Sequence, residues 1–294
     1  MSAGTLVLDG VTYDVTPRAT PTPTPDPTPT PTPVPGGRGQ RRVLWHHGWS
    51  GPAIGSWPAD VRARLTTVCL AMSQSARAGT GQLRPPPGVT RQEVASLVAD
   101  GVDVLVGIGG SGDGGITITT AGQVAEAVTS VLGWQTSLGT TGVCLDLEGA
   151  PGQGWTPEAM VSLGTQLAAH GQHVAIWSAL YGGRLAGWGA VAQALGDRLS
   201  HWQRGFYDFV EAQDNRLTKI VTDDLTAMRG YVLRDDQLVC SFAPVGATSR
   251  TPVPVMRAAF TAALAARPTV GWSVWEDRQD SAAGWPATLA LARL

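Results

Sequence analysis

The stretch Thr141-Gly142-Val143-Cys144-Leu145-Asp146-Leu147-Glu148-Gly149 has the pattern of a buried strand that ends in two carboxylates. Residues two apart on a strand point to the same face, so Asp146 and Glu148 are expected to project the same way. Two acids held close together do not both ionise easily, so the pKa of one is expected to rise toward the range of acid catalysis. A strand end whose acids lie in solvent or pair with arginine fits the same local sequence.

Strand-like and helix-like stretches alternate along the chain from Arg41 onward. Apolar, β-branched stretches predict strands at 43–45, 67–72, 102–108, 142–147, 173–178, 207–212, 238–242 and 269–275. Helical patterns lie between them at 91–100, 121–138, 157–170, 185–200, 223–229 and 253–266. This alternation predicts an α/β protein of parallel βα units, and eight units in roughly 250 residues suggest a closed (β/α)8 TIM barrel. A doubly wound open sheet is the alternative.

Two short segments precede the predicted barrel domain, which spans residues 41–294. Residues 1–16 alternate around Asp9-Gly10, a two-residue hairpin signal, and are too few to fold alone. We expect them either to dock on a partner or to form a frayed tail. Residues 17–40 are a Thr-Pro repeat followed by glycines. The prolines exclude helix and central strand and predict an extended spacer of about 60 Å, or a solvated tail without an anchoring role.

Composition limits the classes of function. The chain has 294 residues, a net charge of -2 and only 15% charged residues, so no basic stripe suggests a nucleic-acid partner. The three cysteines lie singly in apolar runs, which predicts small buried side chains and neither disulfides nor metal ligands. The first 15 residues lack the pattern of a signal peptide, and no apolar run reaches the roughly 18 residues of a membrane span.

Polar and aromatic residues gather where the predicted strands end, the place where a barrel of this kind carries its catalytic groups. The first strand ends in Trp45-His46-His47-Gly48-Trp49, the third in Gly109-Gly110, the fourth in the two acids and the eighth in Trp275. Tryptophan rings stack on sugar rings while carboxylates and amides bind hydroxyl groups, so the rim is expected to bind a sugar. Adjacent histidines point apart on a strand, so we expect no metal site and no cofactor.

These motifs, in this order, resemble the family 18 glycoside hydrolases, which include chitinases and endo-β-N-acetylglucosaminidases. The family's fourth strand reads D-G-x-D-x-D-x-E, which 141–148 resemble, and its third strand ends in S-x-G-G, which 107–110 resemble. Residues 207–213 are similar to the sixth strand of the plant-type branch, and Trp275 is similar to the tryptophan that floors the sugar site. The resemblance covers about residues 41–280.

The resemblance implies a substrate-assisted, retaining hydrolysis of glycans that contain N-acetylglucosamine. Glu148 matches the general acid, and the substrate's own N-acetyl carbonyl would be the nucleophile, an exception to the two-carboxylate scheme. Asp146 would orient the acetamide, Gln213 would bind near it, and Trp275 would hold the ring. The other positions that the resemblance implies for substrate binding are Asn215, Trp45, Gly109 and Gly110.

The chain departs from the family pattern at several positions. Thr141 and Cys144 replace its first and middle aspartates, Asn215 replaces a tyrosine and Gly107 replaces a serine. The middle aspartate normally shares a proton with the position of Asp146, so that coupling is lost. A catalytically weak or inactive barrel that binds carbohydrate, for host recognition or as a structural module, is therefore the alternative function.

The chain as a whole resembles minor tail proteins of phages that infect GC-rich Gram-positive bacteria. Lys219 is the only lysine beside 20 arginines, a bias typical of a GC-rich genome. The resemblance implies that residues 1–16 attach to other tail proteins in the virion and that the barrel meets a cell-wall or surface glycan. An extracellular bacterial protein is the alternative.

Overall fold

A computed structural model describes residues 39–110, 114–180, 185–207, 214–244 and 251–294, and in the N-terminal part the strands within 4–15. The chain divides into two units, Met1–Thr32 and Pro33–Leu294, which are described separately. In the first unit, β1 (Gly4–Leu8) pairs antiparallel with β2 (Val11–Val15), and Leu8 lies opposite Val11. This pairing is the hairpin that the sequence predicts. Asp9-Gly10 and residues 17–38 lie outside the described part.

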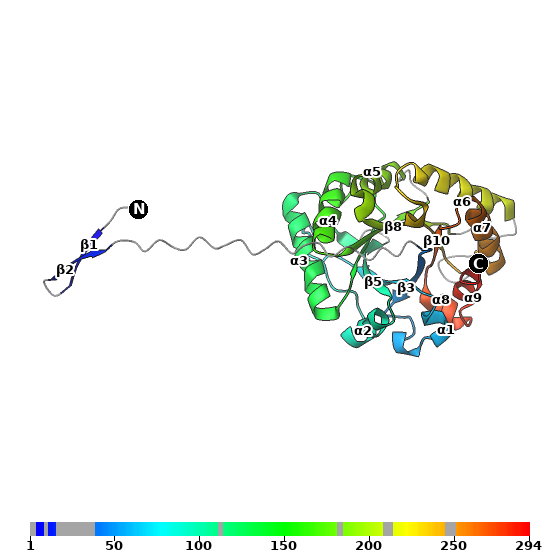
Figure 1. The fold of residues 1–294 in the computed structure, drawn as a ribbon, viewed down its shortest axis with the longest axis horizontal. Coiled ribbons are helices and arrows are strands. Elements are labelled where there is room, and N and C mark those ends of the chain that lie inside the picture. The colour runs from blue at the N-terminus through cyan, green and yellow to red at the C-terminus, as the bar shows by residue number, and fades with distance from the viewer. Residues whose placement is uncertain are drawn as a thin grey trace. The chain divides into compact units, whose positions relative to one another are not determined.

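The second unit is a closed parallel barrel (Figure 1), in the strand order β10-β3-β4-β5-β6-β7-β8-β9. Pairing of β10 with β3 closes the sheet, which confirms the (β/α)8 prediction and excludes the open sheet. The strands are β3 (Arg42–His47), β4 (Thr67–Ser73), β5 (Asp103–Gly110), β6 (Gly142–Leu147), β7 (His173–Ala179), β8 (Leu199–Gly205), β9 (Leu238–Phe242) and β10 (Gly271–Val274).

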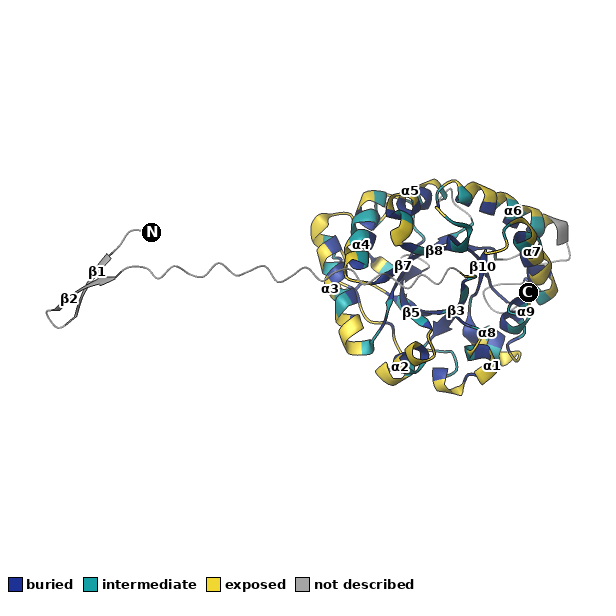
Figure 2. Cartoon of the chain, in the orientation of Figure 1, coloured by how far each residue is buried: buried dark blue, intermediate teal, exposed yellow. Residues whose placement is uncertain are grey.

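Helices surround the barrel, with their exposed faces outward and the buried strands inside (Figure 2). Several begin at threonine caps: Thr156 Oγ1 accepts the N–H of Ala159 ahead of Pro157, and Thr90 forms a capping box with Glu93. The helices are α1 (Ala59–Arg62), α2 (Arg91–Ala99), α3 (Ala121–Leu138), α4 (Pro157–Ala169), α5 (Leu185–Leu195), α6 (Asp214–Arg229), α7 (Val253–Ala266), α8 (Asp277–Ala282) and α9 (Pro286–Leu291).

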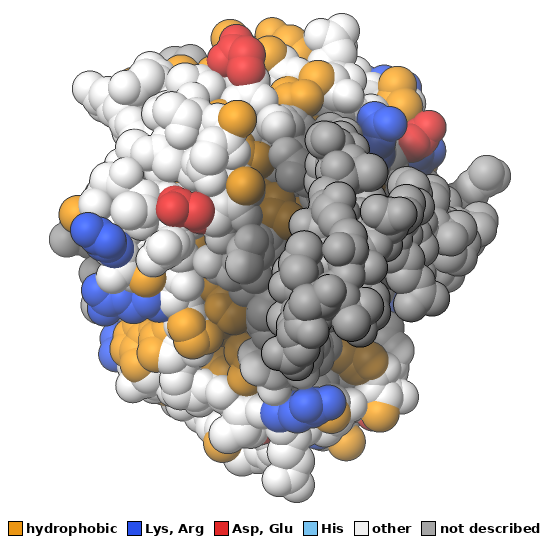
Figure 3. All heavy atoms as spheres, turned by 90° about the vertical axis from the view of Figure 1, so that its left-hand side faces the viewer, with side chains coloured by type: hydrophobic (Ala, Val, Ile, Leu, Met, Phe, Trp, Pro, Cys, Tyr) orange, Lys and Arg blue, Asp and Glu red, His pale blue; other side chains and the backbone are white. Residues whose placement is uncertain are grey.

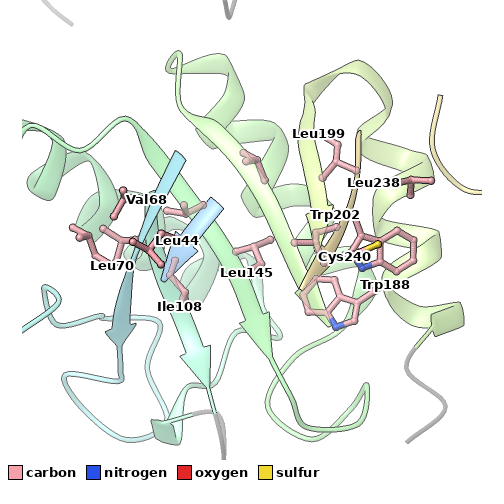
Figure 4. Close-up of a cluster of buried hydrophobic side chains, with 14 of the residues drawn as sticks. Leu44, Val68, Leu70, Ile108, Leu145, Trp188, Leu199, Trp202, Leu238 and Cys240 are labelled. Carbon is pink, nitrogen blue, oxygen red and sulfur yellow. The ribbon is translucent and has the colours of Figure 1, made fainter. Parts of the chain in front are cut away.

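The hydrophobic core has two layers because alternate residues of each strand face opposite ways. Outward-facing side chains such as Leu44, Val68 and Ile108 pack against the helices, and Figure 4 shows a part of this layer. Each such fully buried side chain contributes about 1.5–3 kcal/mol to stability. The inner layer fills the barrel and includes Trp45 and Trp177. The three cysteines are buried free thiols, as their apolar surroundings predict.

The sixth barrel strand is displaced from its predicted position. The sequence places it at 207–212, but the strand is β8, Leu199–Gly205, which the sequence assigns partly to a helix. The error has a physical cause, because β8 carries polar side chains that a hydrophobic pattern does not recognise. Arg204 faces outward and pairs with Asp224 at 2.6 Å, while His201 and Gln203 face the barrel interior and bond to each other.

Charged side chains are sparse on the surface of the second unit. On the face in Figure 3, the Lys and Arg side chains stand in separate groups among uncharged surface.

Within the part of the chain that the structure describes, every helix is too short or too polar to cross a bilayer.

The buried histidine of β8 predicts a pH-dependent stability. Burial lowers the pKa of His201 well below its usual value, and the positive charges of Arg41 and His173 lower it further. The unfolded chain therefore binds a proton that the folded chain excludes when the pH falls below about 6.5, the usual pKa of histidine. We expect the free energy of unfolding to fall there by up to about 1.4 kcal/mol per pH unit for this residue.

Urea unfolding at several pH values between about 7.5 and 5 tests this linkage. The His201→Gln variant should lose part of the pH dependence of the wild-type protein. The matched control is His170→Gln, because His170 is exposed at the end of α4, and it should keep the wild-type dependence. A His201→Gln variant with the full wild-type slope would contradict the prediction.

Candidate active site

The two carboxylates lie where β6 reaches the carboxyl-terminal end of the barrel. Asp146 is the fifth residue of β6 and is only 1% exposed, and Glu148 follows the strand and is partly exposed. Gly109 lies opposite Asp146 in the register of β5 and β6. A Cβ at Gly109 would lie 2.1 Å from the Asp146 carbonyl oxygen, and Gly109 has a φ of 119°, so only glycine fits against the acidic strand end.

Tyr207 lies at the same end of the barrel as the two acids. It follows β8 by two residues, so it continues the inward face of Gln203 and Gly205. Burial raises the pKa of Tyr207 well above its usual value, and the negative charges of Asp146 and Glu148 raise it further. Its hydroxyl therefore stays protonated at neutral pH and can donate a hydrogen bond toward a ligand or toward Ser241 Oγ, which lies 3.3 Å away.

Aromatic rings form a connected group across the mouth of the barrel, with Trp275 at its centre. The Trp275 ring lies 4.8 Å from the rings of Trp45 and His47 and 6.5 Å from that of Trp177. Trp177 lies 5.6 Å from Tyr207, which connects the group to the acids. Trp275 is partly exposed, whereas Trp45 is fully buried beneath it.

A cavity of about 450 Å³ opens beside Trp275, a size typical of small-molecule sites. Two features mark it as a ligand site: an exposed tryptophan, Trp49, and the Gly109-Gly110 backbone that borders the acidic strand end. Trp49 is 54% exposed, the largest exposure of any tryptophan that the structure describes. The cavity is lined by His47, Trp49, Met72, Gln74, Arg84, Pro85, Pro87, Gly109, Gly110 and Trp275.

Asp277 fixes the end of β3 that forms one wall of the cavity. Its carboxylate lies 2.7 Å from His46 Nδ1 and accepts the backbone N–H of His47 at 3.0 Å. Burial alone would raise the pKa of Asp277, but these hydrogen bonds outweigh it and the pKa is lowered. The ionised Asp277 holds His47, whose ring lies 4.8 Å from the rings of both Trp49 and Trp275.

The barrel interior beneath the acids is uncharged and closely packed. Cys144 lies two residues before Asp146, and Gln203 Nε2 is 3.5 Å from its sulfur. Burial, the nearby Cys69 and the charge of Asp146 raise the pKa of the Cys144 thiol, so it is neutral. A Cβ at Gly107 would lie 2.5 Å from the ring of Trp45, so this glycine makes room for the indole.

The structure brings together most of the sequence-predicted site residues. Gly109, Gly110 and Trp275 line the cavity, and Asp146 lies opposite Gly109 in the register of β5 and β6. Three positions need separate comment. Trp45, expected to bind substrate, has no exposed surface and supports Trp275 from below. Gln213 lies outside the described residues, and Asn215 is placed only as a residue of α6.

Sequence reasoning gave no role to Tyr207 or Arg84, which the structure places near this end of the barrel, and it named Trp49 only as part of the aromatic rim. The sequence prediction placed Tyr207 at the start of the displaced strand. Alternate residues of a strand face the same way, so counting in twos from Gln203 through Gly205 would have identified Tyr207 as an inward-facing residue just beyond the strand end. Arg84 lies in a loop that carries no motif. Within the described residues no cluster of three or more His, Cys, Asp and Glu side chains could hold a metal ion.

Comparison with solved structures supports the fold. The chain is similar to a protein from Streptomyces coelicolor assigned as a chitinase A (TM-score 0.70, 16% identity, 86% of this chain and 97% of that chain covered). It is also similar to a family 18 chitinase from Chromobacterium violaceum (0.67, 18%, 100% and 96%) and to the catalytic domain of one from the fern Peteris ryukyuensis (0.68, 17%, 85% and 98%). The barrel therefore has the fold of family 18 chitinases. No family model and no curated protein sequence matches the chain.

The close approach of Gly107 to the Trp45 ring predicts that a larger side chain at position 107 destabilises the protein. Gly107→Ala should destabilise the protein by about 1–3 kcal/mol, because the methyl group would overlap the Trp45 ring in a closed interior. Gly133→Ala is the matched control: Gly133 lies in α3 with open space around it, and alanine there should be neutral or stabilising. Equal free energies of unfolding for the two variants would disprove this account of Gly107.

Proposed function

We propose that the barrel hydrolyses glycans that contain N-acetylglucosamine, with Glu148 as the general acid. The observation that carries the proposal is the placement of Asp146 and Glu148 at the carboxyl-terminal end of β6, at the mouth of a barrel with the family 18 chitinase fold. An acid, a second carboxylate and a protonated hydroxyl beside an aromatic floor form a suitable set of groups for substrate-assisted cleavage of a glycosidic bond.

In the proposed mechanism, the Glu148 carboxyl donates its proton to the glycosidic oxygen as the bond from that oxygen to C1 breaks. The acetamide carbonyl oxygen of the same sugar forms a bond to C1, which gives an oxazolinium-like intermediate. Asp146 orients the acetamide and stabilises its positive charge, and the Tyr207 hydroxyl donates to the acetamide. Water then attacks C1 from the opposite face as the bond from C1 to the acetamide oxygen breaks, and the water gives its proton to Glu148, so the anomeric configuration is retained.

The alternative function is carbohydrate binding without turnover. It is favoured by one observation, the neutral Cys144 thiol where the family pattern has a carboxylate. A site without that carboxylate keeps its aromatic floor and its cavity, so binding would persist even where the chemical step is slow.

Substitution of Glu148 separates the two functions. Glu148→Gln keeps the shape of the side chain but removes the transferable proton, so hydrolysis of N-acetylglucosamine oligomers should fall by about 10²- to 10⁴-fold while binding persists. Product release is measured by chromatography and binding by calorimetry. Glu158→Gln, at an exposed position in the first turn of α4, is the control and should keep the wild-type rate.

Three outcomes distinguish the hypotheses. Loss of hydrolysis in Glu148→Gln alone supports the enzyme. Binding without hydrolysis in the wild-type protein, abolished by Trp275→Ala, supports the binding function. Absence of both from the wild-type protein over a broad panel of glycans contradicts both hypotheses.

We further propose that the chain is a minor tail protein in a phage virion, and that residues 1–16 attach it to other tail proteins. The proposal rests on the short paired strands β1 and β2 and on the Thr-Pro spacer at 17–40, which would hold the barrel away from its anchor. Under this proposal the barrel acts on cell-wall or surface glycans of the host. An extracellular location without a virion is the alternative.

Deletion of residues 1–16 tests the attachment. Particles assembled with the truncated chain should lack the protein in immunoblots, while the purified truncated chain should keep the glycan binding of the full chain. Retention of the truncated chain in purified particles would contradict an anchoring role for these residues.

A further inference from the structure

One wall of the cavity beside Trp275 includes a positively charged residue, Arg84, that the proposed mechanism does not use. We propose that this cavity is a subsite for a sugar that bears a carboxylate, and that Arg84 determines the preference for it. The inference rests on the proposed glycan function and names the substrate class more narrowly, as an acidic N-acetylated glycan in place of a neutral one.

The backbone of Arg84 is fixed to the barrel. The Ser73 hydroxyl, at the end of β4, donates to the Arg84 carbonyl at 2.6 Å, and the Arg84 N–H donates to the Gln74 carbonyl at 2.9 Å. Pro85 and Pro87 follow and restrict the chain further. The backbone that carries this cation is therefore held at the cavity wall by the strand layer that positions the site.

The charge of Arg84 is available to a ligand. The Arg84 side chain is exposed. Within the described ranges, all ion pairs of arginine and lysine are formed by other residues, and Arg84 has no carboxylate partner. The described residues that line the cavity include no acid. A guanidinium group binds a planar carboxylate through two parallel hydrogen bonds, which a neutral hydroxyl cannot reproduce.

The rest of the cavity suits a sugar ring. Trp49 and Trp275 provide apolar ring faces, and the His47 ring lies 4.8 Å from both and is perpendicular to each. Gln74 adds an amide for hydroxyl or acetamide groups. The Gly109-Gly110 wall joins the cavity to the strand end that carries Asp146, so a chain of sugars could occupy this subsite and the proposed cleavage site together.

The experiment compares three tetrasaccharides on the full chain carrying Glu148→Gln, so that the ligands are not consumed. The first contains only N-acetylglucosamine. The second alternates it with the same sugar bearing a lactyl ether carboxylate, and the third is the second with its carboxylates converted to amides. Affinities are measured by calorimetry at low and high salt. We expect the carboxylate form to bind about fivefold more tightly than its amide form, the upper range for an exposed ion pair, with the ratio falling as salt rises.

Variants of Arg84 test whether this side chain determines the ratio of the affinities for the carboxylate and amide forms. Arg84→Gln should reduce it to about one, and Arg84→Lys should retain part of it. Arg77→Gln is the matched control, since Arg77 is exposed in the same loop but does not line the cavity, and it should keep the full ratio. Circular dichroism confirms that each variant is folded.

Two results would overturn the inference: equal affinities for the carboxylate and amide forms in the Glu148→Gln protein, or an unchanged ratio in Arg84→Gln. Both leave the proposed function standing if the neutral sugar binds. Failure of all three sugars to bind would instead contradict the proposed function together with the subsite.

Discussion

The carboxamide of Gln203, at the centre of the barrel, determines how the interior is arranged. The indole N–H of Trp45 can only donate, so the Gln203 oxygen must face it, at 2.9 Å. Gln203 Nε2 then points to His201 Nε2 at 3.1 Å and to the Cys144 sulfur at 3.5 Å. His201 Nε2 must therefore accept, which places the proton on Nδ1, beside the Ser200 hydroxyl at 3.1 Å. One amide thus fixes the rotamer of Trp45 and the neutral state of His201.

This arrangement reaches the candidate site through aromatic contacts. Trp45, held by Gln203, lies under Trp275, which is in turn the shared neighbour of His47 and Trp177. The exposed aromatic floor therefore rests on a buried, hydrogen-bonded indole and has little freedom to collapse into the barrel. A rigid apolar floor suits sugar recognition because less conformational entropy is lost when a ring stacks on it.

The sequence predicts the barrel well because parallel strands buried on both faces give strong apolar runs, such as 142–147 with its terminal acids. It fails at β8, where the inward side chains of His201 and Gln203 are polar and bond only to interior partners. Gln203 also bonds to Trp45 of β3 and contacts Cys144 of β6, and no local pattern indicates these partners from distant strands. The same reason explains Arg84, whose position depends on a bond to Ser73 and not on any motif of its own.

Two of the departures from the family pattern, Gly107 and Cys144, belong to one connected set of contacts. Gly107 gives space to the Trp45 ring, Trp45 binds Gln203, and Gln203 contacts Cys144. A larger side chain at 107 would displace the indole, and a carboxylate at 144 would place a charge against a carboxamide already committed to a histidine and an indole. Restoring one family residue alone would therefore break hydrogen bonds that the other positions supply. The interior is self-consistent as it stands, with a neutral thiol below Asp146.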